Sequence, residues 1–178
     1  VDPHMMKNTE WGAVAYLAQS KYGKNSEVSI NDNSSYYTGG GSGTSYRTNT
    51  AQSTTENTTG IYDMSGGAWE YVAGYVGNGG SYASSLVNAP ARYKDTYSSY
   101  TAPTSGGHYG DAAWETSSSS SSSNGSWYSD YSYFPGSGSF FVRGGVYDNG
   151  SNAGLFNFFD DNGNAWDNDS FRVVVPVL

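Results

Sequence analysis

The sequence predicts an α+β fold rich in loops, with short strands and one or two helices. Residues 9–19 carry apolar side chains at helical spacing. Four short runs, 68–72, 140–143, 154–158 and 171–178, have the alternation or the β-branched and aromatic content of strands. Much of the remainder is dense in Ser, Thr, Asn and Gly, with 24 Gly in 178 residues, which is typical of turns and loops.

The predicted helix at 9–19 has recognisable end signals. Thr9 can cap its N-terminus, and Glu10 suits the first turn because a carboxylate is favoured at the positive end of the helix dipole. Gly23 is a stop signal after Lys21. The apolar stripe that we expect to face the core consists of Trp11, Val14, Ala15, Leu17 and Ala18.

The predicted strands differ in character. In 68–72, alternation places Trp69 and Tyr71 on one face. Val28 and Ile30 alternate with polar residues and predict one further short strand. The run 171–178 reads as a final strand with a β-branched core, which Pro176 confines to an edge or an end.

The region from 75 to 138 is long, irregular and mostly polar. It contains an unbroken serine run at 117–123 and several aromatic clusters, among them residues 127–135. We expect these aromatic side chains to pin the long loops onto the core, because a loop without such contacts would not belong in a compact fold.

Charge and composition exclude several functions. The net charge is −8, and the 8 Lys and Arg residues are scattered, which argues against a nucleic-acid partner. No apolar run reaches membrane-spanning length, so no membrane insertion is expected. The chain has no Cys, which excludes disulfides, thiolate metal sites and cysteine catalysis.

Three motifs together resemble a known family. They are the stretch GIYDMSGGAWEYV at 60–72, the triplet Arg143-Gly144-Gly145 and the closing pair Phe171-Arg172. This set is similar to the signatures of the formylglycine-generating-enzyme-like branch of the C-type lectin fold. The resemblance implies a C-type lectin-like fold with short antiparallel strands, a single domain over 1–178, and a place in the C-terminal part of a longer protein.

More narrowly, the chain resembles the variable proteins diversified by diversity-generating retroelements, which are common in gut bacteria and their phages. The resemblance implies a non-enzymatic domain with a hypervariable ligand-binding segment at about 143–172. It also implies an extracellular location, on a bacterial cell surface or a phage virion, and a protein or glycan ligand on a cell or phage surface.

In such proteins, random replacement of template adenines scatters Asn codons without reaching Lys, Glu, Gln or Met. None of these four types occurs in 146–170, although an Asn- and Asp-rich loop could lack them by chance. Trp166 does not arise from an Asn codon, so it is either fixed or derived from another codon. The resemblance implies ligand contacts from Val146, Tyr147, Asp148, Asn157, Phe159, Asp160, Asp161, Asn162, Trp166, Asp167, Asn168 and Asp169.

The roles within this segment follow from side-chain chemistry. Tyr147, Phe159 and Trp166 would be aromatic anchors, and the aspartates would select basic or hydrogen-bond-donating partners. Leu155 is expected in the core. Residues expected to hold the backbone while the others point outward are Arg143, Gly144, Gly145, Gly150, Gly154, Phe156, Phe158, Phe171 and Arg172.

Other functions remain open. A calcium-dependent carbohydrate-binding lectin is suggested by Trp166 to Asp169, but Ala165 and Phe171 stand where a calcium loop starting at Asp160 needs Gly and Glu. A structural domain of a pilus or phage tail is a third hypothesis, and a glycosidase is the last. We assign no catalytic residue and no metal ligand, because His4 and His108 are the only histidines and neither lies in a catalytic motif. No cofactor is expected apart from Ca²⁺.

Overall fold

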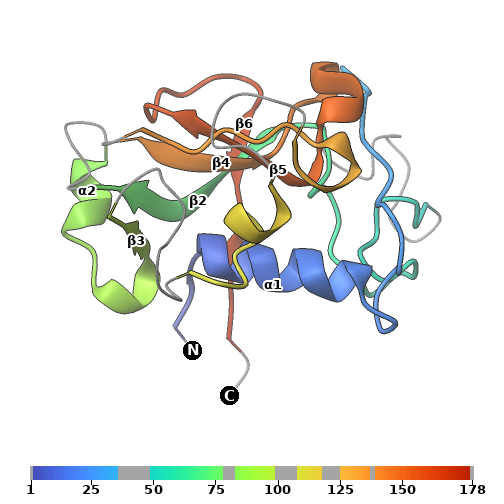
Figure 1. The fold of residues 1–178 in the computed structure, drawn as a ribbon, viewed down its shortest axis with the longest axis horizontal. Helices are drawn as coiled ribbons and strands as arrows, with labels where there is room; N and C mark the ends of the chain where they lie inside the picture. Colours follow the sequence, from blue (N-terminus) through green and yellow to red (C-terminus); the bar gives the residue numbers. More distant parts are fainter. Residues whose placement is uncertain are drawn as a thin grey trace.

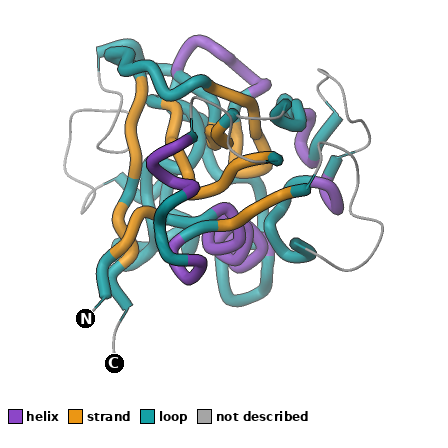
Figure 2. The backbone as a smooth tube through the Cα atoms, turned by 90° about the vertical axis from the view of Figure 1, so that its left-hand side faces the viewer, coloured by secondary structure: helices purple, strands orange, loops and turns teal. Residues whose placement is uncertain are grey.

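The protein has an α+β fold, seen in a computed structural model that describes residues 2–35, 49–77, 83–98, 108–117, 125–136 and 139–176. A five-stranded sheet lies over one long helix, and the chain ends lie close together (Figure 1). Loops and turns connect these elements over much of the chain (Figure 2). Within the described ranges, no helix is long and apolar enough to span a membrane.

The elements follow one another along the chain with long connections. The helices are α1 (Asn8–Gln19) and α2 (Ser84–Val87), and the strands are β1 (His4–Met5), β2 (Trp69–Val76), β3 (Asp95–Tyr97), β4 (Phe140–Gly144), β5 (Gly154–Asp161), β6 (Asp169–Phe171) and β7 (Val173–Val174). Short 3-10 turns are η1 (Ala91–Tyr93), η2 (Trp114–Thr116), η3 (Trp127–Ser129) and η4 (Tyr147–Asn152).

Helix α1 confirms the predicted helix, with a different start. It begins at Asn8, after Lys7, whose backbone N–H donates to Glu10 Oε2 at 2.8 Å. Thr9 is therefore not the cap; its own N–H donates to Asp95 at the start of β3, at 2.7 Å. The buried stripe is also narrower than predicted, since Leu17 is 45% exposed.

The sheet is mixed. The order β3-β2-β4-β5 places β2 and β4 in the middle, and β6 also pairs with β2. The β2–β4 and β4–β5 pairs are antiparallel, as expected, but β3 and β6 both run parallel to β2. The expectation of antiparallel strands is wrong for these two, because each reaches β2 through a long connection rather than a hairpin.

Glu70 of β2 has a strand partner on each side. It pairs with Arg143 of β4 on one side and with Ser170 of β6 on the other. Its carboxylate also accepts hydrogen bonds from the Arg172 guanidinium. The chain between these two neighbours of Glu70 includes β5 beyond β4, and it returns to β2 through β6.

The C-terminal strand is split and lies at the surface. β6 joins the large sheet, whereas β7 pairs with β1 in a separate two-stranded sheet. Val173 and Val175 are exposed, so the predicted β-branched core strand is wrong for residues 171–176, and residues 177–178 lie outside the described chain. The strand predicted at Val28 and Ile30 is also absent from the described chain there; Asn31 forms only an isolated bridge to Gly66.

The core lies between α1 and the sheet and includes the aromatic loops. Phe134 is buried, and its ring packs edge-on against Phe141 and Phe158, with 5.6 Å between centroids in both pairs. Trp127 contacts Phe156 at 4.9 Å. These contacts confirm that aromatic residues pin the 127–135 cluster to the core. The serine run lies outside the described residues from 118 onward.

Candidate functional site

One face of the sheet carries a concentration of aromatic side chains. On β2, Trp69 and Tyr71 point to this face, while Glu70 and Val72 are buried on the other. The strand register extends the face across four strands. We call it the aromatic face; its members are Trp69, Tyr71, Phe140, Val142, Phe159, Asp161, Asp169 and Phe171.

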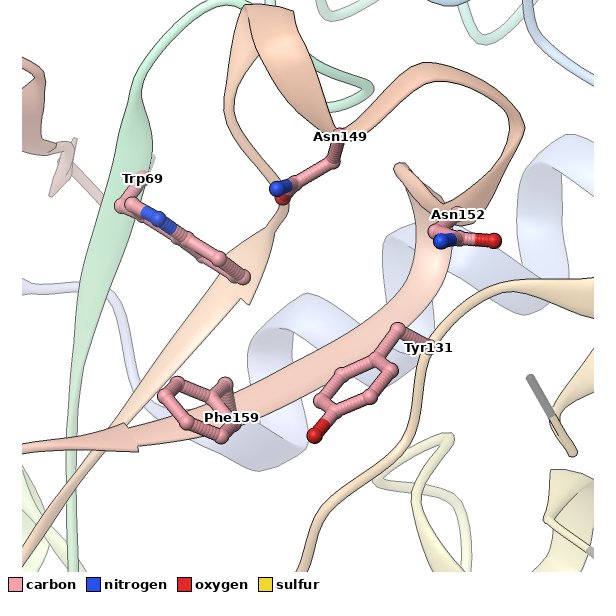
Figure 3. Close-up of a pocket in the computed structure, with 5 residues that line it drawn as sticks. All are labelled: Trp69, Tyr131, Asn149, Asn152 and Phe159. Atoms are coloured by element: carbon pink, nitrogen blue, oxygen red, sulfur yellow. The ribbon is translucent and has the colours of Figure 1, made fainter. Parts of the chain in front are cut away.

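A pocket of about 270 Å³ opens on the aromatic face, lined by Trp69, Tyr131, Asn149, Asn152 and Phe159. Figure 3 shows the indole of Trp69 reaching from β2 towards the opening, with the Phe159 and Tyr131 rings on a second side. The two asparagines come from η4 on the remaining side. Three separate parts of the chain thus build one concave surface.

Phe159 is the centre of the aromatic wall. Its ring lies 6.1 Å from the Trp69 ring, with an angle of 29° between the planes. The Tyr131 and Tyr133 rings lie 5.6 and 5.3 Å from it and are tilted by 60° and 53°. Such tilted and offset pairs are favourable arrangements for rings, so the wall is preformed.

The asparagine side of the pocket is held by hydrogen bonds. Asn149 Oδ1 accepts from the N–H of Val146 at 2.9 Å, and the N–H of Tyr147 donates to Gly67 O at 2.9 Å. From below, Asn157 Nδ2 donates to Asn152 O at 2.7 Å. These bonds fix η4 over the sheet and leave the Asn149 and Asn152 amides at the opening.

The loop after β5 is tied down by Tyr71. Its hydroxyl donates to Asp161 and lies 3.2 Å from Asn164 O. Burial, together with the Asp161 carboxylate, raises the pKa of Tyr71, which keeps the hydroxyl protonated and able to donate. Asp169 Oδ2 accepts from Trp166 N at 3.2 Å. These bonds hold the backbone of the loop, and the Trp166 side chain is 62% exposed to solvent.

The predicted binding residues are spread over this side of the molecule. Phe159 lines the pocket. Those that are exposed on the surrounding loops are Asp148, Asn162, Trp166 and Asp167, and those that are half-buried are Tyr147, Asp160, Asp161, Asn168 and Asp169. Burial raises the pKa of Asp160 and Asp169, so their carboxylates retain protons to a higher pH than usual.

Two predicted contact residues do not point outward. Val146 is 4% exposed and Asn157 is fully buried. The physical reason is η4: Asn157 is held beneath it by the hydrogen bond to Asn152 O, and Val146 is the cap residue directly before η4. Asn157 supports η4 through its bond to Asn152, so its polar side chain serves the scaffold rather than a ligand.

The predictions of residues that hold the backbone agree better with the structure. Arg143, Phe156 and Phe158 are fully buried, and Leu155 is in the core as expected. Gly144 and Gly145 have φ of +83° and +74°, a conformation that favours glycine. Phe171 pairs with Tyr71 through its backbone in β6, and its side chain is 64% exposed.

A second, more apolar pocket of about 490 Å³ lies beside the first. Its apolar lining residues are Met5, Tyr71, Leu86, Ala89, Phe140 and Phe171. Sequence reasoning missed most residues of both pockets. The alternation at 68–72 was the available signal for Trp69 and Tyr71, whereas Tyr131, Asn149 and Asn152 carry no periodic signal.

Buried ionisable groups lie beneath the site. Asp130 sits below β5, where burial raises its pKa to about 8, and burial lowers the pKa of Arg143 to about 10. Arg143 donates to Ala112 O at 3.0 Å. These groups join loops to the sheet from the core side and do not line the pocket.

The histidines lie away from the aromatic pocket. His4 bonds to Glu10 at 2.9 Å, and His108 stacks on Tyr97 with 4.0 Å between centroids. Within the described part of the chain, no three His, Cys, Asp or Glu side chains gather closely enough to hold a metal ion. The pocket therefore offers aromatic faces and amide groups, which are suited to binding.

No protein-family model, no curated protein and no solved structure matches this chain. The site is therefore interpreted from its own geometry.

Proposed function

We propose that this chain is a non-enzymatic ligand-binding domain, with a C-type lectin-like scaffold and a binding surface supplied by the segment 143–172. One observation carries the proposal. The aromatic pocket combines Asn149, Asn152 and Phe159 of that segment with Trp69 and Tyr131 from outside it. A segment that is anchored at both ends and lines a preformed pocket is suited to changing ligand contacts without changing the fold.

The lectin-like scaffold is supported by how the chain uses irregular structure. The described parts between β2 and β4 contain only short elements, yet Ala112, Ala113 and Phe134 from this region are buried in the core. Packed, non-regular segments beside a small sheet fit the fold that the three sequence motifs suggest.

The retroelement-diversified character is the second part of the proposal. In it, the domain is displayed outside a bacterial cell or on a phage virion and recognises a protein or glycan. The exposed Trp166 and the acidic loop residues around it supply the anchor and polar contacts that such recognition needs.

Sequencing the locus across a population of the source organism or phage tests this proposal. We expect substitutions to concentrate at exposed or pocket-lining positions, namely Tyr147, Asp148, Asn149, Asn152, Phe159, Asn162, Trp166 and Asp167. Arg143, Asn157 and Phe158, which are buried, should stay fixed. Substitutions spread evenly along the chain would contradict the proposal.

A partner screen provides a second test. The purified domain would be used to probe surface proteins and glycans, with Phe159→Ala and Trp166→Ala as loss-of-contact variants. Tyr109→Ala is the matched control, because Tyr109 is exposed and lies outside the segment. A partner retained by both loss-of-contact variants would not be using this surface.

A further inference from the structure

The chemistry of the aromatic pocket indicates the class of ligand. Trp69, Tyr131 and Phe159 each offer a ring, and none of the five lining residues is charged. Aromatic faces carry negative electrostatic potential. The chain as a whole has a net charge of −8, so its long-range field also attracts cations.

We propose that the pocket, with the present residue at 159, binds a weakly hydrated organic cation of the partner, either a quaternary ammonium or a guanidinium group. The inference rests on the proposed function, because it assumes that the aromatic face is the ligand-binding surface.

The ring geometry suits such a cation. The Trp69 and Tyr131 rings lie 6.1 and 5.6 Å from Phe159 and are inclined to it by 29° and 60°. Figure 3 shows the three rings on two sides of the opening, with Asn149 and Asn152 on the remaining side. A cation at the opening is within reach of more than one ring, and attraction is significant within about 6 Å of a ring centroid.

Quaternary ammonium and guanidinium groups differ from a lysine ammonium in how strongly water binds to them. A lysine ammonium is strongly hydrated, and the lining has no carboxylate to replace its water. Quaternary ammonium and guanidinium groups lose less hydration on entering an aromatic pocket. Among the described residues, the side-chain amide of Asn152 has no hydrogen-bond partner, so its oxygen is available to face a cation.

Phe159 is the member of the aromatic wall that lies in the segment 143–172. Trp69 and Tyr131 belong to the framework, so two rings stay in place when residue 159 changes. The preference for a cation should therefore depend on an aromatic residue at 159, and a change there should alter the ligand class while the fold is retained.

Calorimetric titration of the chain with small probes tests the inference. The probes are choline, Nα-acetyl-arginine amide, methyl glucoside as an uncharged sugar, and 3,3-dimethylbutan-1-ol, which has the shape of choline without its charge. We expect at least one cation to bind about tenfold more tightly than the neutral alcohol, which is what one desolvated cation–π contact provides. The inference is overturned if neither choline nor the arginine derivative binds more tightly than the alcohol, or if only methyl glucoside binds.

Two variants test whether the cation binds in the aromatic pocket. Phe159→Leu keeps an apolar side chain and removes the ring, so affinity for the cation should fall about tenfold while the weak binding of the alcohol changes little. Tyr109→Leu removes an exposed ring elsewhere and should leave both affinities unchanged. Thermal unfolding of each variant verifies that it is folded, and the wild-type comparison of choline with its neutral analogue stands without any variant.

The probes also distinguish the source of the cation. Preference for choline indicates a quaternary ammonium head group, and preference for the arginine derivative indicates a protein side chain. If neither cation binds more tightly than the neutral alcohol, but population variation is concentrated in 143–172, the cation inference is wrong and the proposed function stands. Variation spread evenly along the chain would instead contradict the proposed function.

Discussion

The Asp130 carboxylate lies against the bare Cα of Gly154, where a Cβ would stand only 2.1 Å from Oδ2. The same oxygen accepts a hydrogen bond from the N–H of Phe156 at 2.9 Å. β5 therefore begins by passing over the buried carboxyl group of Asp130, which fixes its path. This contact joins the 127–135 cluster to the strand that carries Phe159.

Gly154→Ala should destabilise the protein by about 3 kcal/mol, because the new methyl group collides with Asp130 and the φ of +154° is rarely adopted by L-residues. Gly136→Ala is the matched control, since its Cβ would meet no atom within 4 Å; it should change stability by less than about 0.5 kcal/mol. Urea unfolding measures both. Equal losses of stability would mean that the collision with Asp130 does not cause the destabilisation.

Asp130→Asn should change how stability depends on pH. Burial raises the folded-state pKa of Asp130 to about 8, well above that of the unfolded chain. The folded protein thus holds a proton that the unfolded chain releases, and stability is lost as pH rises from about 4 to 8. The variant lacks this proton, so its stability relative to wild type should rise by roughly 1.4 kcal/mol per pH unit across that window.

Chemical denaturation of both proteins at pH 5 and pH 7 gives the comparison. Other titrating groups contribute equally to the two proteins and cancel in the difference. A difference that stays constant between the two pH values would show that Asp130 is ionised in the folded protein.

Arg172→Met should cost about 3 kcal/mol, because it leaves the Glu70 carboxylate buried and without its ion-pair partner. Burial already raises the pKa of Glu70 despite Arg172. The loss should therefore be largest at neutral pH and shrink as pH falls towards 4 and Glu70 is protonated. Adding Glu70→Gln to the variant should recover part of the stability. A loss independent of pH would point to packing of Arg172 instead.

Tyr71→Phe should loosen the loop 162–168, because it removes the hydroxyl that bonds to Asp161 and Asn164. We expect faster amide hydrogen exchange in that loop and a loss of about 1 kcal/mol in unfolding free energy. Tyr109→Phe, whose hydroxyl is at the surface, is the control. Unchanged exchange in the loop would indicate that other contacts hold it.

Periodic segments could be predicted from the sequence. The helix and the strands β2, β4 and β5 each carry a pattern that burial imposes on consecutive residues, and the pairing of Trp69 with Tyr71 on one face follows from alternation alone. The 127–135 aromatic cluster was also predictable, because so many rings in a polar loop need a core to pack on.

The burial of Asn157 and the parallel pairing of β6 were not predictable in this way. Asn157 is polar and lies in an Asn-rich stretch, and it is buried only because η4 folds over it. The direction of β6 depends on where a long loop returns. Tyr131 and Asn149 line the pocket through contacts between distant segments, and a single sequence carries no periodic signal for these.

Because Glu70 pairs with both Arg143 and Ser170, residues 144–169 begin and end beside one residue, and within them η4 and the loop 162–168 lie on either side of the sheet strand β5. Closing a flexible loop between fixed points costs only about 0.6 kcal/mol more for each doubling of its length. Foreign sequences of varied length could therefore be grafted into η4 and the loop 162–168 while β5 and its buried residues are retained. In engineering terms, β2, β4 and β5 would serve as a display scaffold with two insertion sites.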